Sequence, residues 1–201
     1  MSHSAHNMNS SRLEAFSDGV FAILITIMVF GIHAPSGNHF SDLNELKPVF
    51  LTYLLSFTYL IIYWNNHHHL LKTLTFPNGW TMWANSNLLF WLSLIPFATS
   101  WLGTSSGSKA PAVLYGAILL MSAISFSLLS KAIIRSEDGH SSLQHALGDN
   151  IKGKISTLLY IASIIFAFFQ PVISYSIFAA VAIMWVIPDR RIIDELRSDH
   201  S

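Results

Sequence analysis

The sequence contains no cysteine and few charged residues. Of its 201 residues, only 11% are Asp, Glu, Lys or Arg, and the formal net charge is zero. The absence of cysteine excludes disulfides, thiolate metal sites and cysteine nucleophiles. A balanced charge gives no electrostatic basis for binding nucleic acid. Soluble domains usually carry about a quarter of charged residues, so this composition is not that of a soluble protein.

The sequence is rich in long apolar runs. Hydrophobic residues make up 52% of the chain, and the mean hydropathy is +0.47. A membrane-spanning helix needs about 20 mostly apolar residues, so we expect residues 1–201 to form a single all-α integral membrane domain with six spans. The expected spans are residues 13–32, 49–71, 80–102, 111–134, 155–169 and 172–187. Residues 1–11 do not read as a signal peptide, so the first span is expected to remain in the mature protein.

The last apolar run must be divided to fit a bilayer. A single helix over residues 155–187 would be about 50 Å long, whereas the hydrocarbon core is about 30 Å thick. Gln170 and Pro171 lie at its centre and divide it in two. With six spans and both termini in the cytoplasm, most of the basic residues lie inside, as the positive-inside rule requires. The inside residues are Arg12, Lys72, Lys131, Arg135, Lys152, Lys154, Arg190, Arg191 and Arg197, and the outside ones are Lys47 and Lys109.

The first span combines a charged start with a patterned apolar helix. At about 100° per residue, Ile23, Ile27 and Phe30 fall on one bulky stripe. A stripe of small residues, typical of close helix contacts in membranes, runs beside it and consists of Ala15, Gly19, Ala22 and Thr26. Around a symmetry axis the bulky stripe would form a narrow hydrophobic constriction. In a monomer the same residues would pack in the core or face lipid.

Asp18 is a carboxylate inside this span, where such a group needs a partner or a function. Ser17 and Asp18 lie on the side of the helix away from both stripes. The nearest expected partners are Arg12 and the histidines that end the second span. We therefore predict a structural polar network, which Asn85 and Asn87 of the third span could join. Its expected members are Arg12, Ser17, Asp18, Trp64 and one of His67, His68 and His69.

The histidine run does not predict a metal centre. His67, His68 and His69 are consecutive, so on a helix their side chains point about 100° apart. Zinc and di-iron sites on helices need ligands three or four residues apart, together with carboxylates. No Ser/His/Asp set lies on converging spans. We expect no catalytic residues, no metal and no cofactor, although a membrane enzyme built on these histidines remains an alternative.

Three short motifs resemble one family. Phe16-Ser17-Asp18-Gly19 follows Arg12, and a threonine comes eight residues after the aspartate. Trp64 is followed closely by histidines, and the third span contains Asn87 and then Pro96-Phe97-Ala98-Thr99. Together they resemble the transmembrane protein 175 (TMEM175) family of potassium channels over essentially the whole chain.

The resemblance implies an assembly and an ion. Each repeat of that family has six transmembrane helices. Vertebrate members carry two repeats and form dimers in endosomes and lysosomes, whereas prokaryotic members carry one and form tetramers. The chain has no second repeat, so the resemblance implies a prokaryotic homotetramer in the plasma membrane, with a central pore lined by the first helix. It implies a weakly selective, leak-type potassium channel that also conducts protons, with K⁺ as the permeant ion and the lipid bilayer as its surroundings.

The resemblance also implies roles for residues. Ile23 would be the main constriction, Thr26 would favour potassium, and Ile27 and Phe30 would form the next pore rings, with Phe30 in place of the family's usual leucine. A polar network would pack the first helix on the intracellular side, and its members would be Ser17, Asp18, Trp64, Arg12 and either His67 or His68. The main alternative function is a proton-coupled secondary transporter that uses Asp18 and a histidine as its relay.

Overall fold

The computed structural model describes residues 10–136 and 151–186, and every regular element in these ranges is a helix. The elements are α1 (Ser10–Ile27), η1 (Met28–Gly31), η2 (Phe40–Leu46), α2 (Lys47–Lys72), α3 (Gly79–Ser93), α4 (Ile95–Thr104), α5 (Lys109–Ser136), α7 (Ile151–Phe169) and α8 (Pro171–Val186). Arg190, Arg191, Arg197 and the last residue of the sixth expected span, at position 187, lie outside the described residues.

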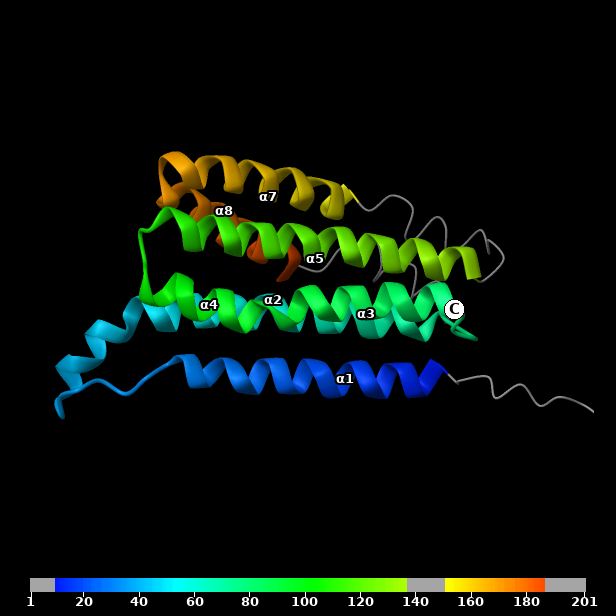
Figure 1. Ribbon diagram of the computed structural model, residues 1–201, viewed down its shortest axis with the longest axis horizontal. Helices are drawn as coiled ribbons and strands as arrows, with labels where there is room; N and C mark the ends of the chain where they lie inside the picture. The colour runs from blue at the N-terminus through cyan, green and yellow to red at the C-terminus, as the bar shows by residue number, and fades with distance from the viewer. Residues whose placement is uncertain (1–9, 137–150, 187–201) are drawn as a thin grey trace, which may run out of the picture.

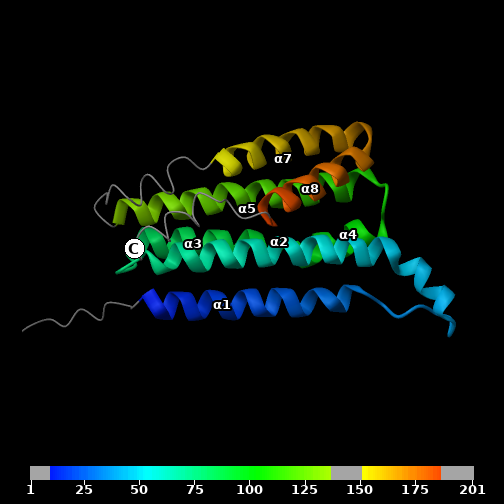
Figure 2. The ribbon, with the colours of Figure 1, turned by 180° about the vertical axis from the view of Figure 1, so that it is seen from behind.

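The helices form an antiparallel bundle along the long axis of the molecule (Figure 1). In both views α1 lies along one edge and α7 along the opposite edge, with α2, α3, α4 and α5 between them (Figure 2). The contacts agree with this order, since α1 packs on α2, α3 and α4, while α5 joins α3 to α7 and α8. The edge position leaves one side of α1 without a neighbour among the helices that the structure describes.

Proline and asparagine set several helix boundaries. Pro48, Pro96 and Pro171 stand in the first turns of α2, α4 and α8, where the missing N–H would have no helical partner in any case. Leu94 separates α3 from α4, and only Gln170 separates α7 from α8. Asn78 caps α3 by accepting a hydrogen bond from the Thr81 backbone N–H over 2.9 Å. The described part of the last apolar run, residues 155–186, therefore turns back on itself instead of forming one long helix.

Within residues 10–136 and 151–186, four helical segments are long and apolar enough to cross a membrane. They are Ser10–Gly31, Phe40–Lys72, Lys109–Ser136 and Ile151–Phe169, and Pro171–Val186 is a shorter apolar helix. The expected third span is present as two helices, α3 and α4, which follow each other along the same line (Figure 1). By length and composition, the described part of the chain is thus that of a protein that crosses a bilayer several times.

The bundle interior combines close backbone contacts with satisfied hydroxyls. A Cβ added at Gly103 would lie 2.9 Å from Cα of Val49, so α2 and α4 approach closely at this point. Thr99 Oγ1 donates to Ser56 Oγ over 2.7 Å, and Ser56 Oγ lies 2.8 Å from the hydroxyl of Tyr115. All three side chains are buried, so this cluster ties α2, α4 and α5 together without an unpaired hydroxyl.

Candidate pore helix and its polar anchor

Helix α1 and the following turn have one buried face and one exposed face. The buried residues recur every three or four positions, as expected for a face packed on the bundle. They are Leu13, Ser17, Phe21, Leu24 and Met28. Their side chains fix α1 to α2, α3 and α4 and thereby determine which residues point away from the subunit.

The bulky stripe lies on the exposed face. Ile23 is 59% exposed, Ile27 40% and Phe30 78%, with Phe30 in the 3₁₀ turn η1. Phe16 continues the stripe toward the start of the helix and is exposed as well. This part of α1 therefore directs large apolar side chains away from the rest of the described bundle.

The edge of small residues beside the stripe is exposed too. Ala15, Gly19, Ala22 and Thr26 all lie at the surface of the subunit. A Cβ added at Gly19 would meet no atom within 4 Å, so no close contact within the described part of the subunit accounts for this glycine. The Thr26 hydroxyl lies 2.9 Å from the backbone oxygens of both Ala22 and Ile23, to which it donates.

A buried hydrogen-bond chain crosses from α2 through α3 to α1. Asn85 Nδ2 donates to Ser17 Oγ over 3.0 Å, and Ser17 Oγ donates to the Leu13 carbonyl over 2.8 Å. The Asn85 carbonyl oxygen must then accept, so His67 donates from Nε2 over 2.7 Å. The His67 side chain is fully buried, and its ring packs against Phe21 at 5.5 Å between centroids. Each donor in the chain has one acceptor, so the orientation of all three side chains is determined.

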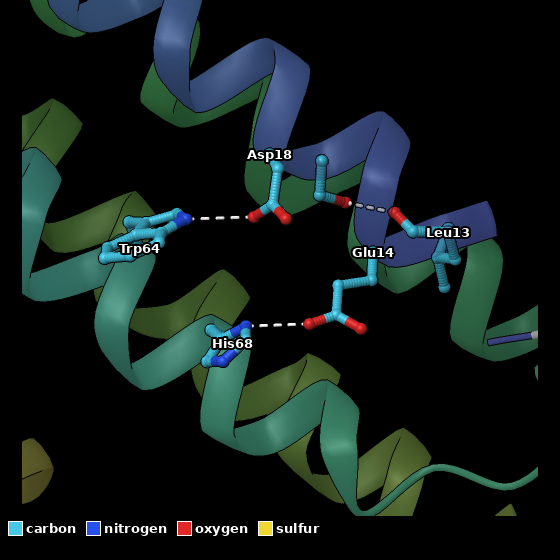
Figure 3. A network of polar contacts seen from close by, with 6 residues as sticks. Leu13, Glu14, Asp18, Trp64 and His68 are labelled. Carbon is cyan, nitrogen blue, oxygen red and sulfur yellow. Dashed lines mark hydrogen bonds and ion pairs between the residues drawn. The ribbon is translucent and has the colours of Figure 1, made fainter. Parts of the chain in front are cut away.

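Two further contacts join α1 directly to α2 (Figure 3). Trp64 Nε1 donates to Asp18 Oδ1 over 2.9 Å, and His68 Nδ1 lies 2.7 Å from Glu14 Oε1. The Trp64 and His68 rings stack at 5.9 Å and 22°. Glu14 and Asp18 are one turn apart on α1, as are Trp64 and His68 on α2. The two contacts therefore lie one helical turn apart along the interface between these antiparallel helices.

The structure thus brings five of the expected network residues to the contact between α1 and α2. They are Ser17, Asp18, Trp64, His67 and His68. Arg12 is exposed, and within the described ranges no hydrogen bond or ion pair joins it to this group. Asn85 is part of the chain, whereas Asn87 donates to Ser125 on α5 over 2.7 Å. His69 is exposed and contacts the His68 ring at 5.7 Å.

Sequence reasoning missed Glu14, which pairs with His68. The spacing contained a signal, because carboxylates at positions 14 and 18 face the same side of a helix, as do the rings at positions 64 and 68. Among residues 10–136 and 151–186, no three His, Asp or Glu side chains gather as a metal site would require. The polar contacts described above join α1 to α2 and α3.

Comparison with known proteins identifies related chains. The model of the family described as endosomal/lysosomal potassium channel TMEM175 matches residues 12–96. A potassium channel of Chryseobacterium sp. (strain P1-3) is 47% identical over 192 residues, which cover 96% of this chain and 100% of the relative. A potassium channel of Chamaesiphon minutus is 34% identical over 131 residues, or 61% of this chain and 64% of that one.

A solved structure agrees with the fold. The crystal structure of a lysosomal potassium-selective channel TMEM175 homolog from Chamaesiphon minutus superposes with a TM-score of 0.76 and 27% sequence identity. The match covers 88% of this chain and 96% of that chain. With several helices able to cross a bilayer, the protein is a multi-pass membrane protein, and its relatives are channels and not enzymes. The chain belongs to the TMEM175 family of potassium channels.

Proposed function

We propose that this chain is a potassium-permeable channel, assembled as a homotetramer of six-helix subunits around a central pore that α1 lines. The observation that carries this proposal is the division of α1 into an anchored face and an exposed face. A helix that faces only lipid has no need of small residues, whereas small residues are typical of close contacts between membrane helices. The exposed small-residue edge therefore makes α1 the helix on which copies of the chain would meet.

The bulky stripe would then face the symmetry axis. Ile23 lies four residues before the end of α1 at Ile27, and four copies of its side chain would form the main hydrophobic constriction. Ile27 and Phe30 would form further rings toward the far end of the helix. The contacts of Ser17, Asp18 and the α2 side chains would serve as the structural anchor of this pore helix, with Arg12 at its edge.

Thr26 is the residue that we propose favours potassium. Its hydroxyl hydrogen is directed to the backbone of its own helix, so the free lone pairs of Oγ1 point outward, where a cation could be coordinated. The relatives named as potassium channels and the potassium-selective homolog support K⁺ as the permeant ion. One hydroxyl per subunit is a sparse coordination set, which agrees with weak selectivity and a leak-type current.

The distribution of basic residues supports an orientation. The bundle end at which α1 begins carries most of the described Lys and Arg residues, whereas Lys47 and Lys109 lie at the opposite end (Figure 1). The basic residues at that first end are Arg12, Lys72, Lys131, Arg135, Lys152 and Lys154. By the positive-inside rule, we propose that this end faces the cytoplasm, that both termini lie there, and that the protein resides in the plasma membrane.

Reconstituted protein tests the proposal. K⁺ and Na⁺ flux is measured in liposomes for the wild type, Ile23→Ala and Thr26→Ala, with the oligomer mass determined on the same samples. Ile23→Ala is expected to raise conductance and weaken discrimination, because it widens the constriction, and Thr26→Ala is expected to lower the K⁺/Na⁺ ratio. Ile165→Ala is the matched control, since Ile165 is 53% exposed on α7 at the far edge of the bundle. A pH-sensitive dye inside the same liposomes reports proton flux.

The outcomes separate the alternatives. If Ile23→Ala and Thr26→Ala both leave conductance and ion ratio unchanged, α1 does not line the pore. A monomer or dimer with slow flux that saturates with ion concentration would instead support a proton-coupled transporter. Single-channel steps from a tetramer would contradict that transporter.

A further inference from the structure

An exposed stripe of aromatic side chains runs along α3 and α4. This aromatic stripe consists of Trp83, Phe90 and Phe97, which recur every seven residues and are each more than half exposed. Because α3 and α4 follow each other along one line (Figure 1), the repeat places all three side chains on one face of the bundle. They expose roughly 400 Å², since a large aromatic side chain can bury about 150–250 Å². That is about half of the 800 Å² or so that one partner contributes to a standard interface.

The small-residue edge of α1 has the same repeat as the aromatic stripe. Ala15 and Ala22 are seven residues apart, with Gly19 between them, and all three are exposed. Two helices that share a seven-residue repeat keep their contact faces together along their length, and each large side chain of one fits between residues of the other. Small residues leave the room that large ones fill. The two surfaces therefore match in spacing and in size.

The small-residue edge and the aromatic stripe also lie at the same height along the bundle. Asn85 on α3 donates to Ser17 on α1, and both helices begin at the same end of the molecule (Figure 1). Positions equally far from this bond in the two helices therefore share a height, because the rise per residue is the same. Phe90 follows Asn85 by as many residues as Ala22 follows Ser17.

Rotation about an axis parallel to the bundle preserves this match. A copy generated by such a rotation is not shifted along the axis, so Phe90 of one copy lies at the height of Ala22 of the next. Trp83 and Ala15, each seven residues earlier, then lie at a common height as well. Two large side chains of one copy thus face two alanines of the other.

The two surfaces point away from each other within one subunit. Ser17 contacts α3 and Asp18 contacts α2. The next residue, Gly19, points a further 100° or so around α1 in the same direction, so the small-residue edge lies beyond α2, on the side away from α3. Phe90 lies about 140° around α3 from Asn85, so the aromatic stripe faces away from α1 of its own subunit. Only a second copy can bring these surfaces together.

We propose that each copy of the chain packs the aromatic stripe of α3 and α4 against the small-residue edge of α1 in the next copy. The inference rests on the proposed function and names the surfaces by which the copies meet. The contact is head-to-tail, because it pairs two different faces, and such contacts generate closed rings of subunits. Phe90 packs at Ala22 and Trp83 at Ala15, which leaves the bulky stripe of α1 turned toward the central axis.

Introduced cysteines test this contact, because the chain has none of its own. The full-length chain with both Ala22→Cys and Phe90→Cys is oxidised in its membranes and analysed on a denaturing gel. Each copy is then bonded to the next one on both sides, so covalent dimers, trimers and tetramers should form. Ala22→Cys alone and Phe90→Cys alone should remain monomers on the gel, since neither face meets its own counterpart.

The matched control combines Ala22→Cys with Trp101→Cys. Trp101 is exposed on α4 but lies about three turns, or about 16 Å, beyond Phe90, so this pair should give no covalent oligomer. If the Ala22 and Phe90 pair also gives none, although the protein is a tetramer by native mass and conducts K⁺, the inference is overturned and the proposed function stands. Covalent dimers from a single variant would indicate a two-fold contact and would likewise overturn it. A wild-type monomer without K⁺ flux would overturn both.

An exchange of side-chain size tests the same packing without cysteine. Ala22→Phe adds an aromatic side chain where Phe90 of the next copy packs, so it should weaken tetramer assembly by about tenfold. Phe90→Ala in the same chain removes the opposing side chain and should restore most of the assembly. Both residues are exposed in the subunit, so the free energy of unfolding should stay at the wild-type value in each variant. Assembly that is no stronger in the double variant than in Ala22→Phe would contradict the pairing.

Discussion

Replacement of Asn85 by alanine should be the most destabilising single change among the polar residues that hold α1. Asn85 is buried, accepts from His67 and donates to Ser17. Asn85→Ala removes both bonds and leaves the His67 Nε2–H buried without an acceptor. An unsatisfied buried donor costs about 1–3 kcal/mol, although interhelical hydrogen bonds in membranes average only about 0.6 kcal/mol. We therefore expect Asn85→Ala to lower the free energy of unfolding by about 2 kcal/mol, because the loss of one bond and the cost of one unsatisfied buried donor add.

Two neighbouring variants calibrate that value. Ser17→Ala removes the acceptor of the Asn85 amide. We therefore expect this variant to lower the free energy of unfolding by about 1 kcal/mol. Asn87→Ala is the matched control, because Asn87 has the same side chain two positions along α3. It is exposed and makes one bond to Ser125, so its loss should cost under about 1 kcal/mol.

The assay is reversible unfolding in mixed detergent micelles, followed by helicity, for all three variants. The expected order of destabilisation is Asn85→Ala, then Ser17→Ala, then Asn87→Ala. Ser17→Ala combined with Asn85→Ala should cost less than the sum of the two, because both act on one bond. If Asn85→Ala destabilises no more than Asn87→Ala, the buried chain does not anchor α1 and the reasoning is refuted.

Further variants test packing and the direct contacts of α1. Gly103→Leu is expected to destabilise the subunit by about 1–3 kcal/mol in the same unfolding assay, because its Cβ would lie 2.9 Å from the backbone of Val49. The side chain added by Gly19→Leu would meet open space in the described part of the subunit. This variant should therefore leave the free energy of unfolding unchanged while lowering the fraction of tetramer seen by native mass measurement. Equal losses of stability in Gly103→Leu and Gly19→Leu would contradict this expectation. Trp64→Phe keeps an aromatic ring but removes the donor to Asp18, so it should lower the free energy of unfolding by about 0.5–1.5 kcal/mol. An unchanged free energy would show that the bond from the indole N–H does not stabilise the subunit.

Periodicity predicted much of the helical architecture but not the pairing of side chains. Apolar runs and prolines place helices where α1, α2 and α5 lie, because burial in a bilayer requires long continuous apolar segments. The same periodicity separated the small and bulky stripes of α1. It carries no information about how far one helix is rotated against the next, and that rotation decides which partner each polar residue meets.

The three consecutive histidines illustrate this limit. Their side chains point in directions about 100° apart, so one of them at most could meet α3, and the position of α3 alone selects His67. His68 then turns to Glu14, and His69 remains exposed. The partner of Asp18 is likewise Trp64 on the facing helix and not Arg12, which is nearer in sequence. The proposed contacts between copies involve the exposed face of α1, whose partner the fold of a single subunit does not define.

The polar contacts of α1 act mainly on its rotation. Ser17 and Ile23 lie about 120° apart around the helix, so a rotation that moved Ile23 off a central axis would also draw Ser17 away from Asn85 and Asp18 from Trp64. Apolar contacts such as those of Leu24 and Met28 tolerate such a rotation, because they are non-directional, whereas hydrogen bonds weaken steeply with angle. The hydrogen-bonded anchor therefore specifies which residues α1 presents on its exposed face, and in the proposed channel its strength would limit how far the constriction can turn.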